Sequence, residues 1–352
     1  MHGDEMKYIQ QAFDTNWVAP LGPNVDGFER EITEYVGIKH AAALVSGTSA
    51  LHLAVKLAGV KSGDVVFCPD LTFAATVNPV SYEGGVQVFI DSERDTWNMD
   101  PKALERAFEK YPDCKCVIVV NLYGVPAKLD EIRSICDAHG ATLIEDAAES
   151  LSATYKGKQT GTFGKYGVFS FNGNKIITSS GGGMLVSDDE EGINKARFWS
   201  TQSRDNAPWY QHSEIGYNYR MSNIVAGIGR GQLLHVEEHK NLKEKIYYRY
   251  KEGLKGLPIK MNPYLECSSP NFWLSCISIN SDAINICTPE KIRLKLEDAN
   301  IEARPIWKPM HMQPIYRTSP FITVEGNGRG RTNAYIKGSG VDVGADIFRR
   351  GL

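Results

Sequence analysis

Short apolar segments that suit β-strands alternate with amphipathic helical segments between residues 41 and 145. The alternation starts with a strand at 41–45 and a helix at 49–58, and it ends with a helix at 129–138 and a strand at 141–145. This order is typical of a mostly parallel sheet covered by helices on both faces. Ligands of such sheets bind beyond the carboxyl ends of the strands. The sequence therefore predicts an α/β fold with one cleft that collects the residues after the strands: Thr48, Phe73, Tyr123 and Asp146.

The pattern changes after a long helical stretch at residues 224–250, which we interpret as a bridge to a second domain. Beyond it we expect a strand at 272–279, a helix at 289–299 and an extended edge at 302–305, which together indicate a smaller α+β unit. The chain has 352 residues, enough for one large and one small domain. We predict a large domain at 1–245, including an N-terminal arm, and a small C-terminal domain at 246–352.

Composition excludes several classes of protein. The net charge of −3 does not suggest a nucleic acid or an anionic membrane as partner. No apolar run approaches the roughly 18 residues of a membrane span, and the polar, acidic N-terminus argues against a signal peptide. Seven scattered cysteines without a C-x-x-C pair favour reduced thiols in the cytoplasm. The glycine fingerprints of dinucleotide-binding sites and P-loops do not occur in the sequence.

The stretch from Phe169 to Gly183 carries the strongest chemical signal. It begins as a strand, turns at Asn172-Gly173-Asn174, and reaches Lys175 before three glycines and a second strand at 184–187. A lysine held on a loop between two apolar strands can be withdrawn from water, which an amine nucleophile needs. The alternative is an ordinary surface lysine beside a glycine turn.

Three further segments favour the first interpretation. Gly47-Thr48-Ser49 opens a helix after a strand, a position where backbone amides and hydroxyls bind phosphate. The strand before Asp146 ends in carboxylates, and residues 216–223 form a polar, aromatic loop that opens another helix. An amine, a phosphate site and a carboxylate are the groups that pyridoxal phosphate (PLP) requires.

These segments resemble the sugar aminotransferases of the DegT/DnrJ/EryC1/StrS family, from about the N-terminus to Arg317. The resemblance implies the fold-type I architecture of PLP enzymes, with a large, mostly parallel sheet domain and a smaller α+β domain. It implies that Lys175 binds the cofactor covalently and that Asp146 pairs with its pyridine nitrogen. It assigns the remaining cofactor contacts to Gly47, Thr48, Ser49, Phe73, Glu149, Ser170 and Asn218.

The resemblance also implies partners. Asn218 is similar to a residue that the neighbouring subunit contributes, which implies a homodimer with shared active sites. Residues 304–311 combine cations and aromatics suited to a nucleotide diphosphate, so Lys308 and His311 are expected to contact substrate. Trp17 is expected either to line a site or to fix the N-terminal arm to a neighbour.

One helical segment has the histidine spacing of a metal site. His235-Val236-Glu237-Glu238-His239 has the H-x-x-E-H spacing of some zinc proteins. Charged residues surround it, so we interpret it as the solvated face of a helix and predict no metal.

The sequence thus predicts a PLP-dependent aminotransferase that moves an amino group, from glutamate by family analogy, to the 4-keto carbon of a nucleotide-linked 4-keto-6-deoxy sugar. The sequence of residues 172–178 is similar to that of enzymes that act on UDP-linked 4-keto-6-deoxy-N-acetylglucosamine in bacillosamine and legionaminic acid routes. Two PLP alternatives stay open: a sugar dehydratase, whose relatives carry His in place of Lys175, and a non-catalytic regulatory homologue. A Rossmann-like dehydrogenase fits the coarse α/β pattern but lacks its glycine fingerprint.

Overall fold

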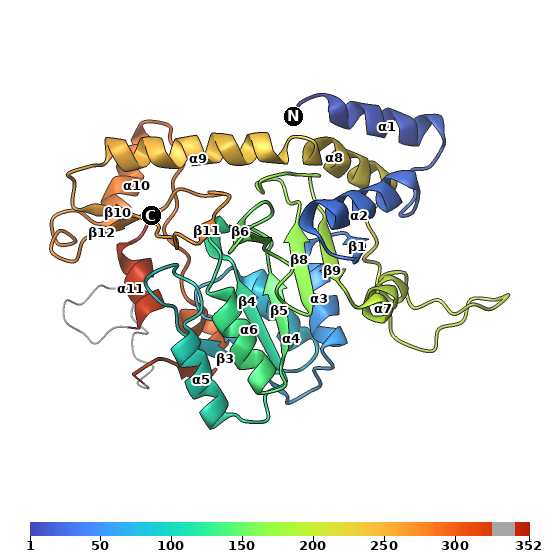
Figure 1. Cartoon of the computed structure of the whole chain (residues 1–352), viewed down its shortest axis with the longest axis horizontal. Coiled ribbons are helices and arrows are strands. Elements are labelled where there is room, and N and C mark those ends of the chain that lie inside the picture. Colours follow the sequence, from blue (N-terminus) through green and yellow to red (C-terminus); the bar gives the residue numbers. More distant parts are fainter. Residues whose placement is uncertain (326–341) are drawn as a thin grey trace.

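A single large sheet organises the computed structural model, which describes residues 1–325 and 342–352. Figure 1 shows this sheet surrounded by helices. It has eight strands, in the spatial order β1 (His40–Leu44), β9 (Gly183–Ser187), β8 (Tyr166–Ser170), β5 (Thr142–Asp146), β4 (Cys116–Val120), β2 (Val65–Pro69), β3 (Val86–Ile90) and β13 (Phe321–Ile322).

Strand direction places the carboxyl ends of most strands at one edge of this sheet. β9 is antiparallel to both of its neighbours, β1 and β8, so those two strands run the same way. The pairs from β8 to β13 are all parallel. Among the described strands of the sheet, β9 alone runs against the others, which confirms the predicted, mostly parallel α/β sheet.

Helices cover both faces of the sheet, as the alternating pattern predicts. One buried cluster includes Leu51, Val55 and Ile118, and a second, on the other face, includes Phe67, Phe108 and Ile132. Burial of these apolar side chains stabilises the layers. The helices of this part are α2 (Pro23–Val36), α3 (Gly47–Leu57), α4 (Ala74–Tyr82), α5 (Pro101–Lys110), α6 (Leu129–Ala138) and α7 (Glu190–Ser200), with a 3₁₀ turn η1 (Leu122–Gly124). A small sheet joins β6 (Thr154–Tyr155), β7 (Lys158–Gln159) and β11 (Ser268–Ser269).

The long helix predicted at 224–250 is two helices, α8 (Asn223–Leu233) and α9 (Val236–Gly253). Leu234 and His235 separate them, and the N-terminal helix α1 (Asp4–Asp14) lies beside α8 in Figure 1. Within the described residues, no helix combines the length and the apolar character needed to cross a membrane.

The C-terminal part returns to the large sheet. It contains β10 (Ile259–Met261), β12 (Ile277–Ile279), α10 (Pro289–Asp298), the 3₁₀ turns η2 (Met310–Met312) and η3 (Pro314–Tyr316), and α11 (Val343–Arg350). The strand predicted at 272–279 is shorter and comprises only Ile277–Ile279; Phe272, with a positive φ of 53°, is outside the extended region. The extended edge predicted at 302–305 forms no strand. The division at residue 245 stays a prediction, and β13, which lies in the predicted small domain, pairs with β3 of the large sheet.

Candidate active site

Lys175 lies on the loop between the antiparallel strands β8 and β9, and its side chain is only 13% exposed. Its Nζ atom is 3.5 Å from Oε1 of Glu149 and 4.0 Å from the centroid of the Trp273 ring. The loop is held by Trp273, whose Nε1–H donates to the carbonyl of Asn174 at 2.7 Å, and by a hydrogen bond that the amide of Ser179 donates to the carbonyl of Phe171 at 2.9 Å. The amine therefore has a fixed position at the carboxyl edge of the sheet.

Asp146 ends β5 at the same edge and is buried. Oδ2 accepts a hydrogen bond from the hydroxyl of Thr76 at 2.7 Å, and Oδ1 accepts one from the amide of Ala148 at 3.1 Å. Burial raises the pKa of Asp146, against the hydrogen bonds from Thr76 and Ala148 and the positive charge of Lys175, which lower it. A buried carboxylate of this kind is best stabilised by an opposite charge at its open side.

The pKa of Glu149 is affected by the charges of both Asp146 and Lys175. Its Oε2 accepts a hydrogen bond from the amide of Tyr123 at 2.7 Å. Burial raises the pKa of Glu149 to about 7, with a further rise from Asp146, while Lys175 and the Tyr123 amide oppose the change. The site therefore holds a carboxyl group that titrates near neutral pH.

The N-terminus of α3 is where the sequence predicts an anion site, and its first residues form a capping box. Ser46 caps the helix, and its hydroxyl accepts from the amide of Ser49, whose own hydroxyl donates to the Ser46 carbonyl. Both polar groups of Ser49 are thus engaged in the capping box, so the cofactor contact expected of Ser49 is weakened. The amides of Gly47 and Thr48 belong to the first turn of a helix, where intrahelical acceptors are lacking.

Ser170, at the end of β8, lies directly beside this helix start. A Cβ atom on Gly47 would meet the Cβ of Ser170 at 3.0 Å. A side chain at Gly183 would meet the backbone of Ser46 at 2.3 Å, which explains why the third glycine after Lys175 must be a glycine. Gly47, Thr48 and Ser170 can therefore converge on one anion.

Aromatic rings line the approach to the site. Phe73, the residue before α4, is 56% exposed, and its ring centroid is 5.3 Å from that of Trp307. Trp307 also lies 4.9 Å from the Tyr123 ring, and its amide donates to the Tyr123 hydroxyl at 3.1 Å. The exposed face of Phe73 suits stacking on a planar ligand, and Lys308, half-buried, follows Trp307 directly.

Sequence reasoning missed two of these residues. The sequence pattern includes Trp273 only in an expected strand and indicates no role for Thr76. Thr76 follows Phe73 by three residues, and residues three apart lie on the same face of a helix. The periodicity of α4 could therefore have placed Thr76 near the same strand end as Phe73. No local pattern marks Trp273, because its contacts are with residues about a hundred positions away.

The structure does not bring three predicted residues to this place. His311 is fully buried, its Nδ1 lies 2.7 Å from Oδ2 of Asp70, and its ring stacks on Phe321. Its ring has no exposed surface in this chain, and the substrate contact expected of His311 stays a prediction. Trp17 and Asn218 are exposed on the part of the chain near the start of α8.

The residues fit PLP. Lys175 would bind its aldehyde, Asp146 would face the ring nitrogen, Gly47, Thr48 and Ser170 would hold the phosphate, and Phe73 would cover the ring. The burial of Asp146 supports this fit, because a protonated ring nitrogen supplies the opposite charge that a buried carboxylate needs. When bound, the cofactor withdraws electrons from the bond that is to be broken.

Comparison with known proteins agrees with this chemistry. The profile of the DegT/DnrJ/EryC1/StrS aminotransferase family matches residues 1–325. EpsN of Bacillus subtilis (strain 168), named as a pyridoxal phosphate-dependent aminotransferase, is 51% identical over 100% of this chain and 88% of its own length. The GDP-perosamine synthase of Caulobacter vibrioides is 36% identical, over 90% of this chain and 85% of its own.

A solved structure of a DegT DnrJ EryC1 StrS aminotransferase from Brucella abortus has the same fold. It superposes with a TM-score of 0.86 at 26% identity, covering 99% of this chain and 89% of that one. Together with the family profile, these matches confirm the fold-type I architecture and PLP as the cofactor, and exclude the dehydrogenase alternative. The chain belongs to the DegT/DnrJ/EryC1/StrS aminotransferase family.

Proposed function

We propose that this enzyme transfers an amino group from glutamate to the 4-keto carbon of a nucleotide-linked 4-keto-6-deoxy sugar. The observation that carries the proposal is the fixed amine of Lys175 beside Glu149, with the buried Asp146 on the same edge of the sheet. Retention of the amine disfavours the dehydratase alternative, because those relatives carry histidine at this position.

Each residue has a distinct task in this proposal. Nζ of Lys175 would serve as the base that takes a proton from the donor and as the acid that returns one to the product. Asp146 would supply the negative charge that pairs with the ring nitrogen of the bound cofactor. The Trp273 ring and Glu149 hold the Lys175 amine in one orientation, which limits the entropy lost when the proton moves.

The nucleotide is proposed to be a uridine diphosphate. The support is the resemblance of residues 172–178 to enzymes acting on UDP-linked 4-keto sugars, and the side chains of Trp307 and Lys308 beside Phe73, which suit a base and a diphosphate. The GDP-perosamine synthase at 36% identity makes guanosine diphosphate the competing choice.

The assay that tests this proposal supplies the holoenzyme with glutamate and a panel of UDP-, GDP- and dTDP-linked 4-keto-6-deoxy sugars. We expect the largest kcat/KM for a UDP-linked member, with product mass showing a carbonyl oxygen exchanged for an amine. Preference for a GDP sugar would correct the nucleotide. Loss of water without gain of nitrogen would replace the aminotransferase with the dehydratase.

We further propose a homodimer in which Asn218 completes the site of the other subunit. Asn218 is exposed, and it lies between Tyr217 and Tyr219, whose rings stack at 4.9 Å beside His52. Because successive side chains of an extended segment point to opposite sides, Asn218 points away from this aromatic group.

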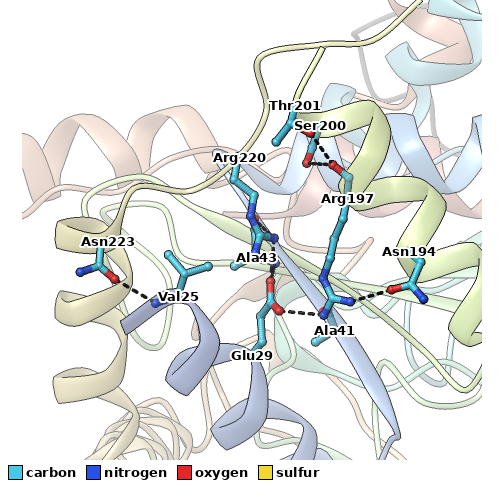
Figure 2. Close-up of polar contacts among 10 residues, drawn as sticks. All are labelled: Val25, Glu29, Ala41, Ala43, Asn194, Arg197, Ser200, Thr201, Arg220 and Asn223. Carbon is cyan, nitrogen blue, oxygen red and sulfur yellow. Dashed lines mark hydrogen bonds and ion pairs between the residues drawn. The ribbon is translucent and has the colours of Figure 1, made fainter. Parts of the chain in front are cut away.

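The segment that carries Asn218 is fastened by a buried carboxylate. Figure 2 shows Glu29 between two arginines: Oε1 accepts from Arg220 at 2.7 Å, and Oε2 accepts from Arg197 at 2.8 Å. Oε1 also accepts from the amide of Ala43 at 2.7 Å, which ties α2, β1 and α7 to this segment. Asn218 is thus presented outward from a rigid base.

Exposed apolar side chains next to this segment also favour an interface. The loop after α7 extends away from the body of the molecule in Figure 1 and carries Trp209, Tyr210 and Ile215, which are 65%, 78% and 79% exposed. Aromatic residues of this kind are enriched at interfaces. Trp17, whose carbonyl accepts from the side chain of Asn223 at 2.7 Å, lies near the start of α8.

We also propose a cytoplasmic location, which the seven free cysteines support.

A further inference from the structure

Three histidines meet where the N-terminus reaches the junction of α8 and α9, as Figure 1 shows for the chain end. The sequence pattern favours a solvated helix face at His235 and His239, but it does not show that His2 joins them. The ring of His2 stacks on that of His235 at 3.7 Å, and its Nε2 is 2.8 Å from Nε2 of His239. Candidate ligand atoms of His2, His235 and Glu238 all lie within 4.8 Å of one another.

Hydrogen bonds to neighbouring groups fix the rings of the two helix histidines. Nδ1 of His239 lies 2.8 Å from the carbonyl of Ile176, so Nδ1 carries the proton and Nε2 keeps a lone pair toward His2. Nε2 of His235 lies 2.8 Å from Oδ2 of Asp4, which leaves Nδ1 beside Glu238 at 3.4 Å. A histidine that binds metal generally donates its other N–H to a carbonyl or carboxylate in this way, which fixes the ring.

We propose that His2, His235 and Glu238 bind a divalent transition-metal ion, with Zn²⁺ as the best match, and that His239 positions His2 as the acceptor of its Nε2 proton. Two imidazole nitrogens, one carboxylate oxygen and a water molecule are a tetrahedral donor set that zinc accepts. With Zn–N bonds of about 2.0–2.1 Å, tetrahedral ligand nitrogens lie roughly 3.3 Å apart. Because the rings of His2 and His235 are stacked in nearly parallel planes, the His2 ring has to turn before both rings can direct a nitrogen at one ion.

The position of this site gives it a structural role. A bound ion joins the segment before α1 to the start of α9, two elements far apart in the sequence. Through the hydrogen bond of His2 to His239, and that of His239 to the Ile176 carbonyl, the ion also supports the loop that carries Lys175. The ion does not touch the reacting groups, so the expected effect is on stability rather than on the chemical step.

The test uses the holoenzyme, freed of unbound PLP and treated with a chelator that is then removed. Cobalt(II) is titrated as a visible probe of tetrahedral coordination, and zinc binding is followed by calorimetry. We expect one ion per chain and a rise in Tm with zinc. Affinity should fall at least tenfold in His235→Ala and in His239→Ala, the range found when such ligands or their supports are altered.

Two further variants keep the result interpretable. His2→Ala alters an exposed residue ahead of α1 and should fold normally while losing affinity. His212→Ala removes an exposed histidine whose Nδ1 lies near the Gln202 carbonyl, and it should bind zinc like the wild type. Absence of cobalt bands in the wild type, or equal zinc affinity in the wild type, His2→Ala and His239→Ala, would overturn the proposal.

Discussion

The Nζ atom of Lys175 lies 4.0 Å from the centroid of the Trp273 ring, although the two residues are almost a hundred positions apart. The same indole donates its N–H to Asn174, so a single side chain both covers the amine and holds its loop. Asn271 anchors this tryptophan, because its side-chain amide donates to the carbonyls of Glu149 and Leu151 and its oxygen accepts from the Trp273 amide. The C-terminal part thus sets the geometry of the amine.

Trp273→Phe should keep a ring face over Lys175 but lose the hydrogen bond to Asn174. The loss of one such bond is worth about 0.5–1.5 kcal/mol, so kcat should fall roughly 2- to 13-fold. Trp273→Leu should cost more, because it also removes the cation–π contact. Steady-state kinetics of both variants, beside the exposed control Trp209→Phe, measure the two contributions. Equal rates for Trp273→Phe and Trp273→Leu would mean that the ring face does nothing.

Lys175→Ala should abolish amino transfer while the fold survives, because the residue lies on a loop outside the helices and strands that form the core. Activity is measured with glutamate and the preferred sugar, and the fold by circular dichroism and Tm. The exposed Lys61→Ala serves as the matched control. Turnover comparable to the wild type in Lys175→Ala would remove the central assignment.

Asp146→Asn should retain some PLP but lose about 2–4 kcal/mol of transition-state stabilisation, the scale of removing one preorganised electrostatic partner. That corresponds to a fall in kcat/KM of roughly 30- to 900-fold. Cofactor content is read from the visible absorbance of the purified variant. The exposed control Asp113→Asn should be unaffected, and a near-wild-type rate in Asp146→Asn would reduce Asp146 to a structural acceptor.

Glu149 gives a stability prediction for the cofactor-free protein. Its pKa rises from 4.5 in the unfolded chain to about 7 in the folded one, because burial disfavours the charge. As the pH rises through this window the unfolded state ionises first, so the folded state is progressively destabilised, and the penalty is complete above pH 7. The glutamine of Glu149→Gln does not titrate, so the variant escapes this loss of stability. The unfolding free energy of the variant minus that of the wild type should therefore be larger at pH 8 than at pH 5, by about 2–3 kcal/mol.

Urea unfolding at the two pH values measures this difference. The variant also loses the ion pair with Lys175, which changes its stability at both pH values, so the diagnostic quantity is the change with pH. A relative stability that does not vary between the two conditions would show that Glu149 ionises normally in the folded protein.

Shared active sites predict complementation between two inactive variants. If each site takes Lys175 from one chain and Asn218 from the other, heterodimers of Lys175→Ala and an inactive Asn218 variant contain one intact site. Random exchange puts about half of the dimers in this form, so roughly a quarter of all sites should recover activity. The variants are co-expressed, because a large interface exchanges slowly. Heterodimers that form without regaining activity would place Asn218 outside the partner's site.

Local patterns in the sequence were sufficient to predict the large sheet and the loop that carries Lys175. The alternation of apolar strands and amphipathic helices predicted the parallel sheet, and the direction rule for such sheets placed Thr48, Phe73 and Asp146 at one edge. The turn before Lys175 and its glycines predicted a lysine on a loop between two strands, which β8 and β9 confirm. These predictions succeed because helix and strand periods, caps and turns act between residues close in sequence.

Only the tertiary structure decided the rest. It put Trp273 against Lys175, buried His311 against Asp70, divided the helix at His235 and carried His2 to His239. Each of these contacts joins residues that are distant in the sequence or depends on how much water reaches a side chain. Periodicity fixes which face of an element is apolar, but the partner of that face, and so the burial and pKa of a group on it, follows from packing between elements.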